Sequence, residues 1–339
     1  MICRVLVGVA VLFLGVTPRA GASVPEGPRI SLIMFNGASS RIELSTMGLH
    51  GEGLRVFSAS DRAEPEDLSW PGDGATLAFS KNLGLRDQGI YTVPAEGGKH
   101  QFVSGTKYSF QPVFSPDGQR IAFARLRVWY GKREGRLRRF ASESVWLVDA
   151  QGGLPVRLTP WRAGLLLSPS SFSPDGSVLA LSRESASGMT REAVALRLAD
   201  RSIYSIAKGS TEPVFSPDGS QIAMLRIKPR RNLPELFRGH VFGSDVVVAR
   251  PDGSGSKRLT HSPNVRETSL SWDPSGERLI YIRRRPKLTL SALFGIGSPV
   301  IQMNADGTCR HRLLREPDVS YRDIAWQPGP GREAGPISC

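Results

Sequence analysis

The stretch that decides the fold is Phe114-Ser115-Pro116-Asp117-Gly118-Gln119-Arg120-Ile121-Ala122-Phe123. Its first half has the chemistry of a tight turn. Proline presets φ for the first central position, aspartate can bond the local backbone, and glycine accepts a positive φ. Apolar residues stand on both sides of the turn. The stretch therefore predicts two antiparallel strands joined by a short loop.

The same turn recurs along the chain. Ser-Pro-Asp-Gly stands again at 173–176 and 216–219, with degenerate copies at 71–74 and 273–276. Each copy follows an aromatic residue and precedes an aliphatic residue at a constant distance, which indicates one loop geometry used repeatedly. A sixth aromatic residue, Trp326, is followed by Gln-Pro-Gly. The aromatic residues of the five complete units are Trp70, Phe114, Phe172, Phe215 and Trp272.

Each unit goes on to a third apolar run, a Gly- or Asp-rich turn and a fourth run that ends in copies such as Arg157-Leu158-Thr159. Four strands per unit are typical of a propeller blade. The chain begins with strands two to four of a blade, over about 29–58, and ends with a lone first strand at 324–326. We therefore predict an all-β fold, a single six-bladed β-propeller whose ring is closed by the N- and C-terminal strands in one blade.

The F-S-P-D-G-x-x-I-A-F pattern with its G-G or D-G turns and R-L-T ends resembles the repeats of the TolB-like β-propeller family, over about residues 29–328. Similar repeats occur in the propellers of prolyl-oligopeptidase-type peptidases. The resemblance implies the fold rather than a function, because such propellers serve many roles. The small α/β domain that precedes the propeller in TolB has no counterpart here, so the resemblance does not imply partner recognition through it.

The N-terminus has the pattern of a secretory signal. Arg4 precedes an apolar run over 5–16, and Ala20-Gly21-Ala22 fits a cleavage site. We expect a signal peptide over 1–22, a propeller over 23–328, a C-terminal tail over 329–339, and a periplasmic or extracellular location. The alternative is an uncleaved N-terminal anchor. Export would also permit a disulfide between Cys309 and Cys339, although a disordered tail with free thiols is the alternative.

The chain shows no motif of a catalytic or cofactor site. There is no G-x-S-x-G nucleophile motif and no H-E-x-x-H or Cys/His cluster, so we assign no catalytic residue, no cofactor and no firm metal site. The repeated aspartates of the turns are interpreted as structural. One weaker pattern lies three residues before the aromatics, at Asp67, Gln111, Pro169, Glu212, Ser269 and Asp323. Asp67 and Asp323 would stand on neighbouring blades at the channel, where they could hold a cation or pair with arginines.

Positive charge is concentrated in three segments. The formal net charge is +13, and 127–144, 227–245 and 283–299 hold most of the excess. All three would be long loops between second and third strands, which emerge on one face of a propeller. They also contain apolar groups, which could fold down as a lid over the channel. The predicted basic face consists of Arg127, Lys132, Arg133, Arg136, Arg138, Arg139, Lys228, Arg230, Arg231, Arg283, Arg284, Arg285 and Lys287.

These features predict an exported, non-catalytic binding or scaffold propeller that recognises an anionic envelope component or an acidic protein through its basic face. Contact with a membrane surface would fit the same charge, whereas nucleic acid fits the charge but not the export signal. The alternative is a lyase or hydrolase acting on an acidic polysaccharide at the channel mouth. A weaker option is a scaffold in an envelope transport complex, by analogy with TolB.

Overall fold

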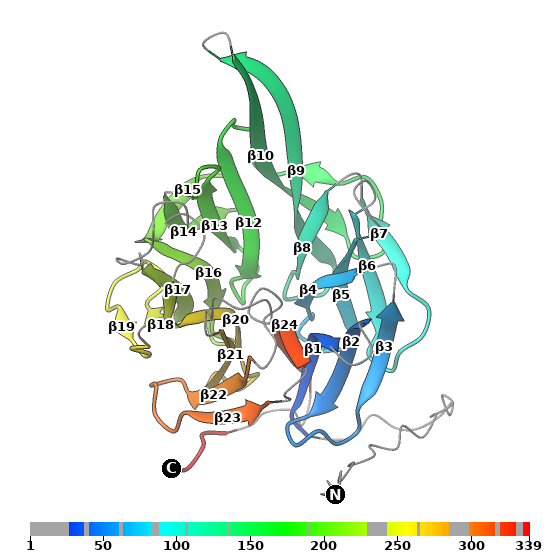
Figure 1. Cartoon of the computed structure of the whole chain (residues 1–339), viewed down its shortest axis with the longest axis vertical. Coiled ribbons are helices and arrows are strands. Elements are labelled where there is room, and N and C mark those ends of the chain that lie inside the picture. The colour runs from blue at the N-terminus through cyan, green and yellow to red at the C-terminus, as the bar shows by residue number, and fades with distance from the viewer. Residues whose placement is uncertain are drawn as a thin grey trace, which may run out of the picture.

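The computed structural model describes residues 27–36, 41–60, 64–82, 88–105, 108–133, 136–188, 190–228, 243–262, 265–284, 298–315, 319–329 and 335–339. Their strands form six four-stranded antiparallel sheets, which surround a central channel (Figure 1). The prediction of an all-β, six-bladed propeller is confirmed. Within these ranges no helix is long and apolar enough to cross a membrane. The expected signal peptide over 1–22 lies outside the described residues.

Each blade has one inner strand and three strands that follow outward. We number the blades I to VI along the chain. Their strands, from the channel outward, are β24 (Val319–Gln327), β1 (Arg29–Asn36), β2 (Arg41–Gly48) and β3 (Arg55–Ser60) in blade I; β4 (Glu64–Ser69), β5 (Thr76–Asn82), β6 (Gln88–Pro94) and β7 (Gln101–Ser104) in blade II; β8 (Ser109–Phe114), β9 (Arg120–Arg133), β10 (Arg136–Asp149) and β11 (Val156–Arg157) in blade III; β12 (Leu165–Phe172), β13 (Val178–Ser185), β14 (Arg191–Arg197) and β15 (Ile203–Lys208) in blade IV; β16 (Ser210–Phe215), β17 (Ile222–Lys228), β18 (Gly243–Ala249) and β19 (Lys257–Arg258) in blade V; and β20 (Arg266–Trp272), β21 (Arg278–Arg284), β22 (Val300–Asn304) and β23 (His311–Leu314) in blade VI.

Blade I closes the ring as predicted. Its inner strand β24 comes from the C-terminal end of the chain and pairs antiparallel with β1 near the N-terminus, placing Trp326 opposite Ile30 and Ile324 opposite Leu32. Ile30 and Leu32 are fully buried, and Trp326 is 4% exposed. The two ends of the chain are therefore joined by backbone pairing and by a shared core, which leaves no open edge in the ring.

The geometry of the turns explains why one tetrapeptide pattern is repeated along the chain. In the first perfect copy Asp117 Oδ1 accepts the amide of Gln119 at 3.0 Å, and Gly118 adopts a φ of +68°. A side chain on Gly118 would also meet Pro71 of the preceding blade at 3.1 Å, and one on Gly219 would meet Pro174 at 3.2 Å. Each glycine thus meets two demands, a left-handed backbone and close approach to the neighbouring turn.

The core lies between the blades rather than in one place. Six clusters of buried apolar residues each join neighbouring sheets. The small residues that follow each turn, Ala78, Ala122, Ala180 and Ala223, are fully buried. The equivalent residue of blade VI is Ile280, also fully buried, so four of the blades use alanine at this close contact and one accommodates a larger side chain.

One predicted loop is wrong. Segment 127–144 is a continuation of β9 and β10, each 14 residues long, and only 134–135 lie outside the described residues. The pairing of β9 with β10 continues well past the end of the blade, with Trp129 opposite Phe140. The hairpin projects from the rim of the molecule (Figure 1). The other two expected loops lie largely outside the described residues, at 229–242 and 285–297, and so does any lid that they form.

Candidate functional site in the channel and on the projecting hairpin

The inner strands carry a break at the repeat position that precedes each aromatic by three residues. The pairing of every inner strand with its neighbour shifts register there or one residue away. Asp67, Gln111, Glu212 and Ser269 have positive φ values of 53°, 52°, 51° and 55°. Such bulges re-aim a side chain. All six positions of the pattern line one central cavity of about 1290 Å³.

The carboxylates at these repeat positions accept hydrogen bonds from backbone amides of the next blade. Asp67 Oδ2 accepts the amide of Gln111 at 2.9 Å, and Asp323 Oδ2 accepts the amide of Leu68 at 2.8 Å. Glu212 Oε2 accepts the amide of Ser269 at 3.0 Å. The amides that the bulges leave out of the sheet are thereby satisfied across three blade boundaries. The first role of these acids is to hold neighbouring blades together.

Burial of these three carboxyl groups inside the ring raises their pKa values. Burial raises the pKa values of Asp67 and Glu212, because the charged form loses hydration. Burial raises the pKa of Asp323 to about 7, and the charge of nearby Asp67 adds to that rise. The pair predicted as a weak cation site is thus close enough to interact. No group of three or more His, Cys, Asp or Glu residues placed to hold a metal occurs in the described part of the chain, so a cation here would depend on these two carboxylates.

Arginines stand at the same cavity. Arg284, at the end of β21, and Arg322, on β24, both line it. The Arg284 guanidinium donates to the Tyr321 carbonyl at 3.1 Å and the Arg322 carbonyl at 3.4 Å. Burial and the charges of Arg266 and Arg322 lower the pKa of Arg284. The sequence analysis placed Arg284 on an exposed loop. In the structure it is the last residue of β21 and lines the channel.

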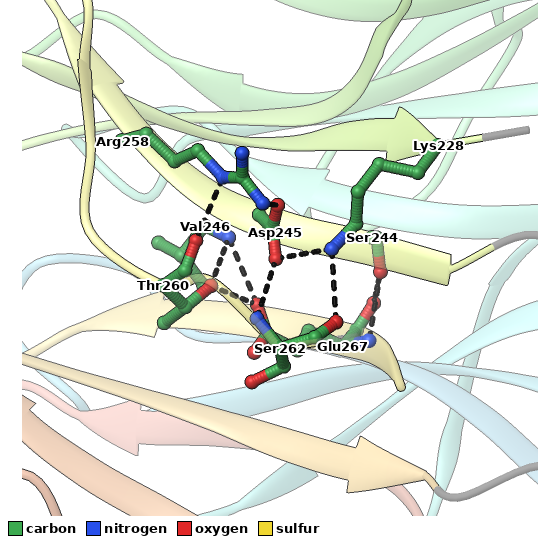
Figure 2. A network of polar contacts seen from close by, with 8 residues as sticks. All are labelled: Lys228, Ser244, Asp245, Val246, Arg258, Thr260, Ser262 and Glu267. Carbon is green, nitrogen blue, oxygen red and sulfur yellow. Dashed lines mark hydrogen bonds and ion pairs between the residues drawn. The ribbon is translucent and has the colours of Figure 1, made fainter. Parts of the chain in front are cut away.

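Lys228 is not a free member of the basic face. Its Nζ lies 2.6 Å from Asp245 Oδ1 and 2.9 Å from the Ser262 carbonyl. Figure 2 shows Lys228 and Arg258 converging on Asp245, beside a second buried acid, Glu267. Glu267 Oε2 accepts the amide of Val246 at 2.9 Å. This network joins blades V and VI, and Asp245 neutralises charge that the sequence alone assigned to ligand binding.

The projecting hairpin keeps its basic residues away from the blade core. Arg127 is exposed and its guanidinium carbon lies 5.7 Å from the Trp129 ring centroid. Trp129 and Phe140 stack with their centroids 5.7 Å apart. Tyr130 is 66% exposed. The backbone register sets Arg138 opposite Gly131 and Arg136 opposite Arg133, so the remaining basic residues follow one another along a two-stranded ribbon.

Other members of the predicted face are placed only in part. The side chains of Lys132, Arg133, Arg136, Arg138 and Arg139 lie outside the described atoms, although their backbone belongs to β9 and β10. Arg230, Arg231, Arg285 and Lys287 lie outside the described residues altogether. Arg283 is partly buried at the end of β21. Among the members of the predicted face that the structure describes, Arg127 lies on the hairpin, Arg284 lines the channel and Lys228 is paired with Asp245.

The C-terminal tail is fastened to blade VI. Cys309 and Cys339 are joined in a disulfide with their Cα atoms 5.0 Å apart. Asn304 holds the tail from both sides, because its Nδ2 donates to the Ile337 carbonyl at 3.0 Å and its Oδ1 accepts the Ile337 amide at 2.8 Å. The structure therefore has the disulfide rather than free thiols at these two cysteines.

The comparisons with known proteins agree with the fold. No family model and no curated protein matches the chain. Among solved structures, TolB from Acinetobacter baumannii is 20% identical, with a TM-score of 0.68 over 89% of this chain and 67% of that chain. A structure assigned as TolB from Agrobacterium tumefaciens is 18% identical, with a TM-score of 0.58 over 89% of this chain and 99% of that chain. The chain is thus a TolB-like propeller in fold, as its repeats predicted.

A structure of another kind shares the architecture. Oligogalacturonate lyase in complex with manganese is 12% identical, with a TM-score of 0.50 over 86% of this chain and 75% of that chain. At these identities the likeness concerns the fold alone. The presence of both TolB and a lyase among the similar structures means that the fold does not decide between binding and catalysis.

Proposed function

We propose that this protein is an exported, non-catalytic binding module that docks an acidic protein partner through the β9–β10 hairpin. The observation that carries the proposal is the hairpin itself, which doubles the length of a blade strand and carries Arg127 beside the stacked Trp129 and Phe140. Blade stability does not need the extension, because its outer half has no neighbouring strand on the β8 side beyond Arg125.

The composition of the hairpin suits a protein partner. Arginine and aromatic residues are enriched among the side chains that carry binding energy at protein interfaces. Six basic residues stand against Glu134 and Glu143 on this segment, so an acidic surface would be drawn to it and held in register. An isolated two-stranded ribbon is marginally stable in water. A partner that packs on the Trp129–Phe140 pair would supply the missing contacts.

Export fits the same proposal. The N-terminal segment has the pattern of a secretory signal, and the Cys309–Cys339 disulfide suits an oxidising compartment. The acids of the channel are held by backbone amides of the next blade rather than arranged around a nucleophile, which favours binding over catalysis.

The hairpin can be shortened without touching the blade. Val128 faces Ala141 directly, and the Ala141 carbonyl accepts the Gly164 amide at 2.9 Å, so Ala141 is kept and residues 129–140 are replaced by an Asn-Gly turn that joins positions 128 and 141. We expect the shortened protein to melt at the temperature of the natural chain and to bind poly-L-glutamate at least about 10-fold more weakly, a loss of roughly 1.4 kcal/mol. Fluorescence anisotropy of labelled poly-L-glutamate measures this directly.

The shortened hairpin loses five basic residues and Glu134, a net charge of +4. The matched control replaces Arg157, Lys208, Arg226 and Arg312 with serine, since all four are exposed and lie on other strands. It should bind nearly as well as the natural chain. Equal binding by the shortened and natural proteins would refute the proposal. Binding to phosphatidylglycerol vesicles without binding to poly-L-glutamate would also refute it, and would indicate a membrane surface as the target instead.

A further inference from the structure

A second cavity lies between blades II and III, at the level where the pairing of β8 with β9 ends and the hairpin leaves the blade. Its volume is about 480 Å³, and it is lined by β7 with the residue after it and by the turn at 151–155. Of the residues that line it in the described part of the chain, Arg125 alone is charged. Asp149, at the start of that turn, is exposed and is not among them. The cavity is therefore positive.

Two aromatic rings hold the Arg125 guanidinium in place without neutralising it. Its central carbon lies 4.4 Å from the ring centroid of Trp146 and 5.2 Å from that of Phe123. Nη2 makes one long contact, 3.5 Å, with Ser104 Oγ, and Nη1 is neither buried nor bonded to any described residue. No ion pair involves Arg125 within the described ranges. The group is thus positioned, with hydrogen bonds left to donate to a ligand.

Arg125 shares one face of β9 with Arg127, the exposed arginine of the hairpin. Alternate residues of a strand point to the same side, so the two lie roughly 6.4–6.8 Å apart along it. The β10 residues opposite the two arginines are both serine. Glu143 belongs to the other face, where it accepts a hydrogen bond from Ser168 of blade IV at 2.9 Å. Two unneutralised guanidinium groups therefore follow one another along one face.

We infer that this face binds an extended acidic segment of the partner, with one carboxylate on Arg125 in the cavity and a second, two residues along, on Arg127. The inference rests on the proposed function and adds to it the spacing of the acids. Side chains two residues apart in an extended chain share one side at the same separation as the two arginines. A guanidinium presents parallel N–H groups that match the two oxygens of a carboxylate.

The dimensions of the cavity favour an extended chain over a helix. A Cβ atom on Gly152 would lie 3.2 Å from the Val103 carbonyl, so blades II and III approach each other closely at this cavity. A helix with its side chains is about 10–12 Å across, too wide for a space of this volume. Phe102, 54% exposed at the same cavity, offers an apolar contact to the residues beside the bound acid.

The experiment compares two labelled peptides of identical composition and charge on the full chain. One has four Glu-Ser repeats, which place acids two residues apart. The other has two Glu-Glu-Ser-Ser repeats, which contain no such pair but place acids three and four apart, as on one face of a helix. We expect the alternating peptide to bind about fivefold more tightly in fluorescence anisotropy. Arg125→Gln should remove this preference, and Arg226→Gln, at an exposed position of β17, should keep it.

A measurement on the natural chain covers the case in which Arg125→Gln does not fold, as judged by its melting temperature. Because the Trp146 ring lies against the Arg125 guanidinium, the alternating peptide should shift the Trp146 indole N–H signal in the NMR spectrum. The Trp272 signal, from blade VI, should stay unchanged.

Equal affinity for the two peptides, tighter binding of the paired one, a folded Arg125→Gln protein that keeps the preference, or an unmoved Trp146 signal would each overturn the inference. The proposed function would survive these results if shortening the hairpin still weakened binding of poly-L-glutamate. If neither peptide binds and the shortened protein behaves as the natural chain, both fall.

Discussion

At the scale of single residues, the repeat position three residues before each aromatic has two roles. It forms the bulge of the inner strand, and where it is an acid it binds the next blade. The bulge residues have backbone geometry that side chains other than glycine adopt at a cost of about 1–3 kcal/mol. Asp67 and Glu212 offset that cost by accepting amides of the next blade, at the price of losing hydration. Their positions could be predicted from the repeat offset. Their hydrogen bonds could not, because they depend on the stagger between blades.

The burial of Asp323 should be visible as a dependence of stability on pH. Its folded-state pKa of about 7 lies above 3.8, the ordinary pKa of an aspartate, so the folded protein takes up a proton that the unfolded chain does not. The stabilising contribution is therefore complete below about pH 4 and is lost as the pH rises through about 7. Relative to the natural chain, Asp323→Asn should gain stability by on the order of 4 kcal/mol as the pH rises between these limits.

Urea unfolding of both proteins at several pH values measures the difference. Glu96→Gln, in an exposed turn of blade II, is the control for replacing a carboxylate by an amide. A difference between Asp323→Asn and the natural chain that stays constant from pH 4 to pH 8 would show that Asp323 is ionised in the fold throughout.

At the scale of elements, the turns were predictable and the long hairpin was not. The Ser-Pro-Asp-Gly turn encodes its own geometry through Pro116, Asp117 and Gly118, so sequence alone predicts it. In β9 and β10 the density of charge suggested an exposed loop, since charged residues are mostly exposed. The facing pair Trp129 and Phe140 was the available signal for a ladder. Arg284 was misplaced for a related reason, because the end of β21 could not be located from sequence.

The stacked turns make a prediction that separates two effects of glycine. Gly219 and Gly209 both have a φ of +72°. A side chain on Gly219 would lie 3.2 Å from Pro174 of the preceding blade, whereas one on Gly209 would meet nothing within 4 Å. Gly209→Ala should cost about 1 kcal/mol for the backbone alone, and Gly219→Ala about 1 kcal/mol more for the contact. Denaturant unfolding gives both values. Equal losses would mean that the turns do not support one another around the ring.

At the scale of the whole molecule, the ring and its closure could be read from the repeats, since the orphan strands at the two ends complete each other. The distribution of charge needed the structure. Lys228 and Arg258 are used to neutralise buried Asp245, and Arg284 faces the channel. On the hairpin the described basic side chain is Arg127, which is exposed, and the proposed recognition of an acidic partner rests on it together with the run of basic residues in the sequence of β9 and β10.

The most direct measurement compares two variants of identical net charge. One reverses Arg127, Arg138 and Arg139 on the hairpin to glutamate, and the other reverses Arg157, Arg226 and Arg312 elsewhere. Affinity for labelled poly-L-glutamate is measured by anisotropy at about 0.1 M salt, where the screening length is about 10 Å and local charge decides binding. We predict that the hairpin variant loses binding and gains affinity for poly-L-lysine, while the other variant keeps most of its affinity for poly-L-glutamate. Equal affinities in the two variants would contradict the account, because net charge rather than the hairpin would then govern recognition.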